Sequence, residues 1–367
     1  MKKILKYKNA LIIFSVFLIF LLSFYLQALY KSLAKFEEND VDNYINSVIN
    51  NLKDKEYINK YLKDEKVSNK FENNVSKLDA FTNAFNKNNV SYLKVDNNVY
   101  ELLNNNNRIA TLTLKENKEE SVLGLLSYTP LDIANLSFDK GIYSYKIKAN
   151  STYKVYVNDI LLSSDFIKET KEYEELDRPN IKKLTPKIYI YEIDNLLEEP
   201  TIKIQQANKE IISPDIKDNE YEASNPIIYN SYEEAKKHLK NNFNPLVIAK
   251  NWSLYLTADL NGRNGFYTLQ PNLLKGTDLY TRARNWSINY DINFTSPHTL
   301  SDKPFTDVKM DNFKFYGNDF FTVDIKLTKN MILSNGVNKT DELNETFYYS
   351  YIDGNYKLID MKSIEEI

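Results

Sequence analysis

The longest hydrophobic run of the chain lies near its N-terminus. Residues Ala10–Leu29 are almost wholly apolar, and no charged residue occurs from Asn9 to Tyr30. A helix over Ala10–Leu29 would be about 30 Å long, which is the thickness of the hydrocarbon core of a bilayer. Because the run is apolar on every side, a helix of a soluble core is disfavoured. We therefore predict that residues 9–30 cross a membrane.

The charges on either side of this run predict its orientation. Residues 1–8 carry four lysines, whereas Lys31–Asp40 carries two lysines and three acidic residues. Positive residues are retained in the cytoplasm, so we expect residues 1–8 to form a cytoplasmic tail and residues ~31–367 to lie outside the cell membrane. A cleaved signal peptide is the alternative, because Ser32 and Ala34 are small residues at the spacing of a cleavage site. The apolar run is longer, however, than the roughly 7–15 residues of a signal peptide.

Two kinds of hydrophobic period follow each other between residues 37 and 139. Apolar residues recur every three or four positions in Asp40–Leu62 and in Phe71–Phe85, which predicts two amphipathic helices. The period then becomes two, which predicts an antiparallel meander with strands at Val90–Val95, Val99–Leu103, Arg108–Leu114, Val122–Tyr128 and Leu131–Phe138. We expect residues 37–139 to form a first α+β domain, in which helices precede a curved sheet.

Residues 140–212 have no helical period and predict a small all-β domain. Asn158 and Asp159 both tolerate positive φ and predict a hairpin turn. The expected strands are Ile142–Lys148, Thr152–Val157, Ile160–Leu162, Lys187–Ile193 and Thr201–Ile204. The segment that follows is rich in charged residues and carries prolines. It predicts a linker over residues 213–229.

The last part of the chain, residues 230–367, again places helices before strands. Ser231 with Glu234 is a capping-box signature, Pro245 begins a second helix, and a short helix is expected around Asp278–Arg284. Apolar and polar residues alternate in Trp286–Phe294, which predicts a strand with one buried face. The further strands are expected at Val308–Phe315, Phe320–Leu327, Thr346–Ile352 and Tyr356–Met361.

This order of elements, ending in YYSYIDGNYKLIDM at Tyr348–Met361, resembles the cone-shaped nuclear transport factor 2-like superfamily. More loosely, the chain resembles uncharacterised membrane-anchored envelope proteins of low-GC Gram-positive bacteria. The resemblance covers the C-terminal domain well and residues ~37–138 less well. It implies an α+β fold with an N-terminal transmembrane helix and two cone-like domains separated by the all-β module. The superfamily includes isomerases, dehydratases and inert interaction domains, so it implies no single function.

The composition excludes several kinds of chemistry. The chain has no cysteine and only two histidines, which excludes thiolate metal sites and nearly excludes a histidine-based zinc site. With 8 glycines in 367 residues, phosphate-cradling loops are also disfavoured. Residues 1–36 carry six lysines and no acid, so the remainder has 41 basic and 50 acidic residues. A nucleic-acid partner is excluded by this acidic balance, and we expect no metal and no cofactor.

Enzymes of the superfamily that the chain resembles use an inward-facing Tyr, Asp or His, which makes Asp291, Asp324 and Tyr349 candidates. Both aspartates lie on the polar side of their predicted strands, and a chain with 28 tyrosines offers a candidate tyrosine by chance. We therefore assign no catalytic residue and expect no enzymatic activity. A ligand pocket in the C-terminal domain would be lined by Trp286, Tyr290, Phe315 and Tyr349.

The remaining polar candidates have simpler explanations. His238 lies on the charged side of its helix among lysines, and His298 lies in an expected loop with no visible partner, so both are expected at the surface. The segment Asp259–Gly265 alternates oxygen ligands as a calcium loop does. Its register does not match an EF-hand, because Asn264 and Gln270 stand where glycine and glutamate are needed. A turn that ends a helix is the better interpretation.

We therefore expect a single-pass membrane protein, mostly extracytoplasmic, that acts as a non-catalytic binding or assembly module at the cell envelope. Its partners would be the bilayer, through residues 9–30, and an envelope protein or a cell-wall component. The alternatives are a small-ligand-binding or hydrolytic cone at the cell surface and a subunit of conjugation or secretion machinery. An open polar cavity in the C-terminal cone would favour a ligand, and an interior filled with aromatic residues would favour assembly.

Overall fold

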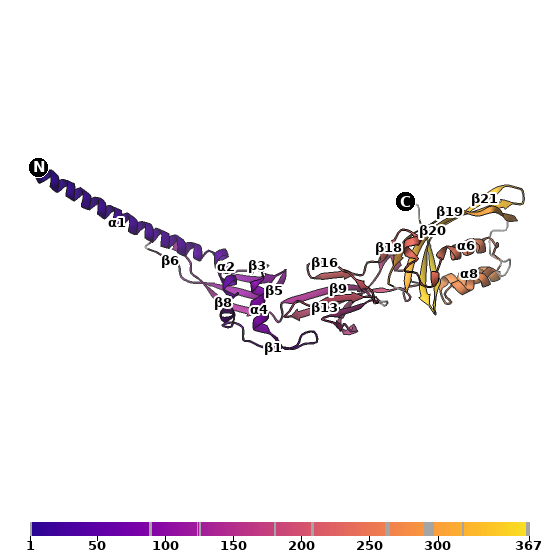
Figure 1. The fold of residues 1–367 in the computed structure, drawn as a ribbon, viewed down its shortest axis with the longest axis horizontal. Coiled ribbons are helices and arrows are strands. Elements are labelled where there is room, and N and C mark those ends of the chain that lie inside the picture. The colour runs from indigo at the N-terminus through magenta and orange to yellow at the C-terminus, as the bar shows by residue number, and fades with distance from the viewer. Residues whose placement is uncertain are drawn as a thin grey trace. The chain divides into compact units, whose positions relative to one another are not determined.

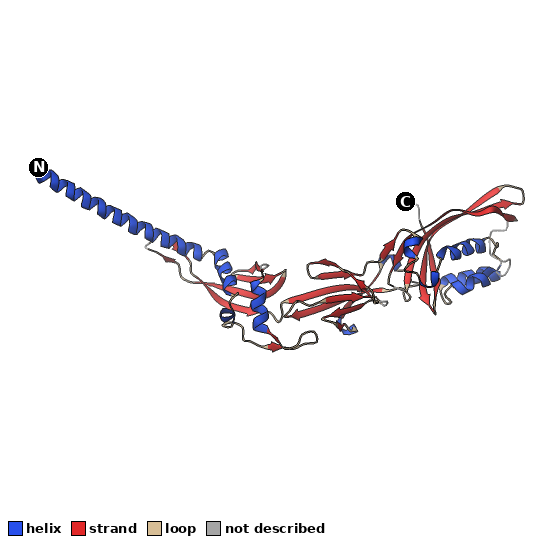
Figure 2. Ribbon diagram, viewed as in Figure 1, coloured by secondary structure: helices blue, strands red, loops and turns tan. Residues whose placement is uncertain are grey.

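The computed structural model has a mixed α+β architecture that begins with one long helix (Figures 1 and 2). The chain forms two compact units, Met1–Ser144 with Ile193–Pro200 and Tyr145–Glu192 with Thr201–Ile367. The boundary between them falls within strands β9 (Tyr143–Asn150) and β13 (Lys187–Leu196). The structure describes residues 2–87, 90–122, 124, 126–179, 181–206, 209–260, 265–289, 297–317 and 319–364.

The predicted N-terminal helix is confirmed as α1 (Lys2–Glu38). It is long and apolar enough to cross a membrane, and the large apolar side chains from Leu11 to Leu26 are exposed. Exposed apolar surface of this extent marks an interaction with lipid or protein. Near its C-terminal end the small residues Ala28 and Ser32 are buried. The end of α1 therefore belongs to the folded part of the first unit.

The first unit places three further helices beside an antiparallel sheet. These are α2 (Val41–Asn51), α3 (Lys55–Ile58) and α4 (Lys77–Asn86), and the side chains of Asp40, Asp54 and Ser76 cap their N-termini. The sheet has the order β3-β4-β5-β8, with strands β3 (Val90–Asp96), β4 (Val99–Asn104), β5 (Asn107–Glu116) and β8 (Leu131–Phe138). Helix α4 packs on this sheet, since the ring centroids of Phe81 and Phe138 lie 5.2 Å apart. Helices followed by a meander were predicted here.

Two short hairpins complete the first unit, and one of them corrects a prediction. The hairpins are β1 (Lys66–Val67) with β2 (Val75–Ser76) and β6 (Glu120–Ser121) with β7 (Ser127–Tyr128). Val122–Tyr128 was expected to be one strand, but of its described residues only Ser127 and Tyr128 are strand. Gly124 has a φ of +70°, a conformation that an extended strand does not have.

In the second unit, two sheets form the β module. The first has the order β11-β10-β14-β15, and the second has the order β12-β13-β9-β17-β16. Their strands are β10 (Lys154–Val157), β11 (Ile160–Leu161), β12 (Ile167–Glu172), β14 (Ile202–Gln205), β15 (Ile211–Ile212), β16 (Asp215–Lys217) and β17 (Glu220–Ala223), besides β9 and β13. The predicted turn is confirmed, because Asn158 and Asp159 have φ values of 49° and 61° between β10 and β11.

The segment expected to be a linker, residues 213–229, contains strands instead. Strand β17 pairs in parallel with β9, β16 pairs with β17, and β18 (Ile227–Tyr229) pairs with β19 (His298–Phe315). Hydrogen bonding to strands distant in the sequence therefore incorporates this charged segment into two sheets. Local composition cannot reveal such pairing.

A five-stranded antiparallel sheet of order β18-β19-β20-β21-β22 forms the C-terminal part of the second unit. Strands β20 (Phe320–Leu333), β21 (Asn338–Ile352) and β22 (Asn355–Ser363) follow β19, and the four predicted strands lie within β19–β22. The preceding helices are α5 (Tyr232–Ala235), α6 (Pro245–Leu256), α7 (Gly265–Leu269) and α8 (Asp278–Asn289). Short 3₁₀ helices occur at Ser164–Phe166, Glu174–Leu176, Lys240–Asn242 and Gln270–Asn272.

The strand predicted at Trp286–Phe294 is wrong at its start, because Trp286 lies in α8. Tyr280 and Ala283 are buried and Trp286 is half-buried, so the helical spacing of three continues to Trp286. A short alternating run cannot be distinguished from helix when a helix already leads into it. The rest of the predicted strand, from Tyr290 to Phe294, lies outside the described residues.

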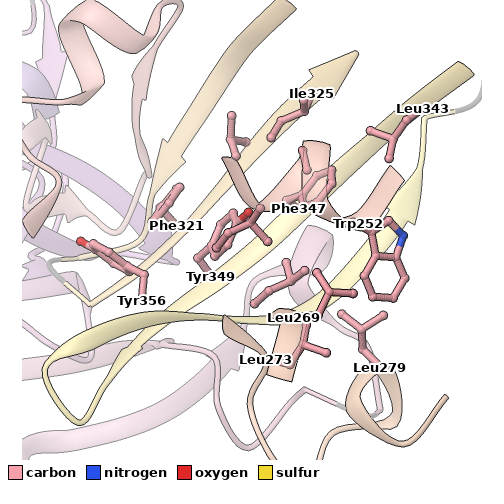
Figure 3. Packing of buried hydrophobic residues seen from close by; sticks show 14 of the residues in the cluster. Trp252, Leu269, Leu273, Leu279, Phe321, Ile325, Leu343, Phe347, Tyr349 and Tyr356 are labelled. Atoms are coloured by element: carbon pink, nitrogen blue, oxygen red, sulfur yellow. The ribbon is translucent and has the colours of Figure 1, made fainter. Parts of the chain in front are cut away.

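One face of the C-terminal sheet and the helices enclose a single core. Figure 3 shows Trp252 of α6, Leu279 of α8 and Phe321, Phe347 and Tyr349 of the strands packed together. The alternate residues of β20 supply this core, as period-two burial requires. A second, smaller cluster joins the β module to the other face of the sheet through Tyr173, Leu176, Ile181, Tyr316, Phe320, Tyr348 and Ile359.

Candidate functional site

A cavity of about 460 Å³ lies in the second unit between the β module and the C-terminal sheet. Its volume is in the range of small-molecule and peptide pockets. The module contributes one wall, and β18, β19 and the segment that follows α5 contribute the other. The lining residues are Tyr153, Gln206, Glu210, Ile227, Tyr229, Lys237, His238, Leu239, Lys240, Phe315, Gly317 and Asp319.

Stacked rings form the centre of this cavity. The rings of Tyr229 and His238 lie nearly parallel with centroids 4.7 Å apart, and Nε2 of His238 lies 2.8 Å from the Tyr229 hydroxyl. Phe315 meets the Tyr229 ring edge-on at 5.6 Å. Burial raises the pKa of Tyr229, so its hydroxyl keeps its proton near neutral pH. His238 is exposed, as predicted, and its partner Tyr229 was not foreseen.

Charged side chains surround these rings. Lys240 pairs with Asp319 and lies 4.0 Å above the ring of Tyr351, a cation–π distance. Gly317 is required at the wall, because its φ is +89° and an added Cβ would lie 2.2 Å from Oγ1 of Thr152. The cavity therefore offers aromatic faces with both signs of charge around them, which suits an amphipathic group.

A second cleft of about 330 Å³ contains the candidate Asp324. Asp324 lies on the face of β20 opposite the core, where its carboxylate accepts hydrogen bonds from Asn312 at 2.8 Å and from Thr346 at 2.6 Å. On the same side, the Tyr316 hydroxyl donates to Glu175 at 3.0 Å, and burial raises the pKa of Tyr316. The donors already satisfy Asp324, which argues for a structural role.

A buried ionic network lies inside the C-terminal part and was not predicted. The ammonium of Lys329 is fully buried and donates to the carbonyl of Ser253 at 2.8 Å and to the hydroxyl of Thr257 at 2.6 Å. Its charge is balanced by Asp341 at 3.4 Å and Asp259 at 4.0 Å. Burial lowers the pKa of Lys329.

His298 joins this network and corrects another expectation. Its side chain is 7% exposed, and Nε2 lies 3.1 Å from the carboxylate of Asp259. The predicted surface position without a partner is therefore wrong. Asp259 lies just after the end of α6, where a helix-ending turn was predicted. Its carboxylate bonds to a histidine that is 39 positions away in the sequence. A local sequence pattern cannot predict such a distant pair.

The predicted lining residues that the structure describes are Phe315, Tyr349 and Trp286. Phe315 lines the aromatic cavity, whereas Tyr349 is fully buried in the core. Trp286 is half-buried with its ring 6.2 Å from that of Trp252. Tyr290 and the catalytic candidate Asp291 lie outside the described residues. The sequence did not predict that Tyr229 and His238 line a cavity. The two residues are nine positions apart on either side of the start of α5, and no sequence motif links them.

Within the described ranges, no group of three or more His, Asp or Glu side chains could hold a metal ion. The imidazoles in this part of the chain have a tyrosine and an aspartate as their partners.

Comparisons with known proteins give a match only among solved structures. No protein-family model matches the chain, and no curated protein matches it. A solved structure described as an "Ntf2 like protein involved in plasmid conjugation" aligns over 75% of this chain and 74% of that one. The probability is 0.96, the TM-score is 0.19 and the sequence identity is 8%. A likeness with so low a TM-score carries no argument about fold or function.

Proposed function

We propose that this chain is a single-pass membrane protein that works as a non-catalytic binding or assembly module of the cell envelope. The observation that carries the proposal is α1, whose apolar side chains are exposed over the length of a bilayer core. Lysines precede this run and acidic residues follow it. The N-terminus then faces the cytoplasm and residues ~31–367 lie outside.

The proposed binding role rests on the hydrophobic core that lies between the C-terminal sheet and its helices. The concave side that would form the pocket of an enzymatic cone is occupied by Trp252, Phe321, Phe347, Tyr349 and their neighbours (Figure 3). We propose that the helices and the bent sheet form a cone of the nuclear transport factor 2-like kind with a packed interior. Such a cone binds through its outer surfaces.

The aromatic cavity at Tyr229, His238 and Phe315 is the proposed binding site. His238 is exposed, Tyr229 is half-buried and Phe315 is buried beneath them, so the site offers a partly desolvated aromatic surface. Aromatic side chains in such pockets are enriched among protein-binding hot spots. An amphipathic segment of an envelope protein is the proposed occupant. A small ligand is the second candidate, because the volume of about 460 Å³ is sufficient for one.

The absence of cysteine from the sequence gives a direct test of orientation. Tyr7→Cys and Ser334→Cys each introduce a single thiol at an exposed position on either side of the apolar run. In intact cells, a membrane-impermeant maleimide should label Ser334→Cys only, and permeabilisation should add Tyr7→Cys. Labelling of Tyr7→Cys in intact cells would contradict the orientation, and the wild-type chain is the blank.

The binding site is tested by crosslinking in membranes followed by capture of the full chain. Tyr229→Ala should lose the captured partner, whereas Tyr267→Ala should retain it, because Tyr267 is an exposed aromatic residue outside the cavity. Equal capture by both variants would place the partner elsewhere. Capture of no partner by the wild-type chain would contradict the assembly role.

A further inference from the structure

The tip of the β6–β7 hairpin of the first unit carries apolar residues. Between the two short strands the structure describes Val122, Gly124 and Leu126. Val122 and Leu126 are half-buried, and Gly124 is exposed. The polar residues lie at the base, where the hydroxyl of Tyr128 donates to Glu120 at 3.1 Å. An apolar tip on a polar stem is typical of elements that enter a membrane interface.

The hairpin lies against α1 with its base toward the folded domain. The backbone N–H of Leu131 donates to the side chain of Asn39 at 3.1 Å, just past the end of α1. Closer to the tip, Tyr128 and Glu120 interact electrostatically with Lys35. Moving from Leu131 to Tyr128 thus corresponds to moving from Asn39 back to Lys35. The hairpin therefore runs along α1 toward the N-terminus (Figure 1).

The height of the tip follows from this direction. Leu126 is two residues beyond Tyr128, about 7 Å of extended strand. That distance equals about five residues of helix, which leads from Lys35 to the neighbourhood of Tyr30. Strand β7 contacts α1, and the small residues Ala28 and Ser32 of α1 are buried there. The apolar tip therefore lies level with the outer end of the apolar run.

We propose that the β6–β7 hairpin is a second membrane contact, which inserts Val122 and Leu126 into the outer lipid interface beside α1. The proposal rests on the proposed membrane anchoring by α1 and adds the partner of the hairpin, a lipid surface. Lipid is the occupant because the half-buried Val122 and Leu126 lie beside α1, whose apolar side chains are exposed. Fixing the hairpin to both lipid and α1 would restrain the tilt of the first unit at the membrane.

Depth-dependent fluorescence quenching tests the proposal on the full-length chain. Single-cysteine variants at Leu126, Phe20 and Asn97 are labelled with a nitrobenzoxadiazole fluorophore in vesicles of phosphatidylcholine and phosphatidylglycerol. Phe20 is an exposed residue of α1, and Asn97 is an exposed turn residue of the same unit. Lipids with a nitroxide on the acyl chain should quench Leu126→Cys and Phe20→Cys and leave Asn97→Cys bright. Val122→Cys should repeat the result of Leu126→Cys.

The controls separate the hairpin from the anchor. If Phe20→Cys is quenched and Leu126→Cys behaves like Asn97→Cys, the hairpin proposal is overturned while the anchor stands. A probe at Leu126 that is shielded from water yet not quenched by the lipids shows a protein contact and also overturns it. If Phe20→Cys is not quenched, the membrane anchoring itself fails, and the hairpin proposal fails with it.

Discussion

Replacement of Tyr349 by phenylalanine should stabilise the C-terminal core. Tyr349 is fully buried in β21, and its ring stacks on that of Phe321 with centroids 5.0 Å apart. Its hydroxyl has no hydrogen-bond partner within the described part of the chain. A buried polar group without a partner costs about 1–3 kcal/mol, and phenylalanine keeps the ring. We expect Tyr349→Phe to raise the free energy of unfolding by about 1 kcal/mol, and the Tm by about 2–4 °C.

Tyr255→Phe is the matched control, because we expect it to lower the free energy of unfolding. The Tyr255 hydroxyl donates to the buried carbonyl of Ala283, so its removal should cost about 1 kcal/mol. Both tryptophans, Trp252 and Trp286, lie in the second unit, and their fluorescence during chemical denaturation of the full chain in detergent follows that unit alone. An equal loss of stability in the two variants would mean that the Tyr349 hydroxyl is bonded, which refutes the reasoning.

Three further predictions address the ionic network, the tyrosines and the first unit. Lys329→Ala should lower the free energy of unfolding by about 3–5 kcal/mol, because it removes the cation near the largely buried carboxylate of Asp259 and the donor to the buried Ser253 and Thr257. A loss below about 1 kcal/mol in the same fluorescence assay would contradict a structural role. Burial raises the pKa of Tyr153 and of Tyr356 to about 12, so the stability they contribute is present below pH ~10 and is lost as the pH rises toward 12. Exposed tyrosines ionise near pH 10 in any case, so the test is the difference in tyrosinate absorbance between the wild-type chain and the Tyr153→Phe, Tyr356→Phe double variant. This difference should rise together with unfolding toward pH 12, and a difference that already rises near pH 10 in the folded protein would oppose the prediction. Gly141→Ala should lower the melting temperature of the first unit in circular dichroism, because an added Cβ would lie 2.2 Å from the backbone of Asn195. An unchanged melting temperature would show that the backbone at Asn195 can move away without cost, which contradicts the prediction.

Local periodicity predicted the elements that depend on near neighbours. Leu131–Phe138 was predicted as a strand with the bounds that β8 has, and Pro245 does begin a helix. The Asn158-Asp159 turn followed from the tolerance of these residues for positive φ. The strand predicted from Trp286 failed because the helical spacing of the preceding turns extends into it.

The candidate site was only partly visible in the sequence. Phe315 was named as a lining residue and does line the cavity, but its ring partners Tyr229 and His238 come from separate segments that β18 and α5 bring together. The burial of Lys329 was not predictable from the sequence either, because a lysine in an alternating strand is normally solvated. Its carbonyl, hydroxyl and carboxylate partners come from α6, the turn after it, and β21.

The sequence by itself determined the long apolar helix, the two helix-then-sheet regions and the acidic bulk, because hydrophobic period and charge are properties of neighbouring residues. Only the tertiary structure decided that residues 213–229 contain strands, that His298 pairs with Asp259, and that the β6–β7 hairpin lies against α1. Each of these depends on segments that are distant in the chain. Their pairing is fixed by the burial and hydrogen bonding of the whole fold, which no local pattern contains.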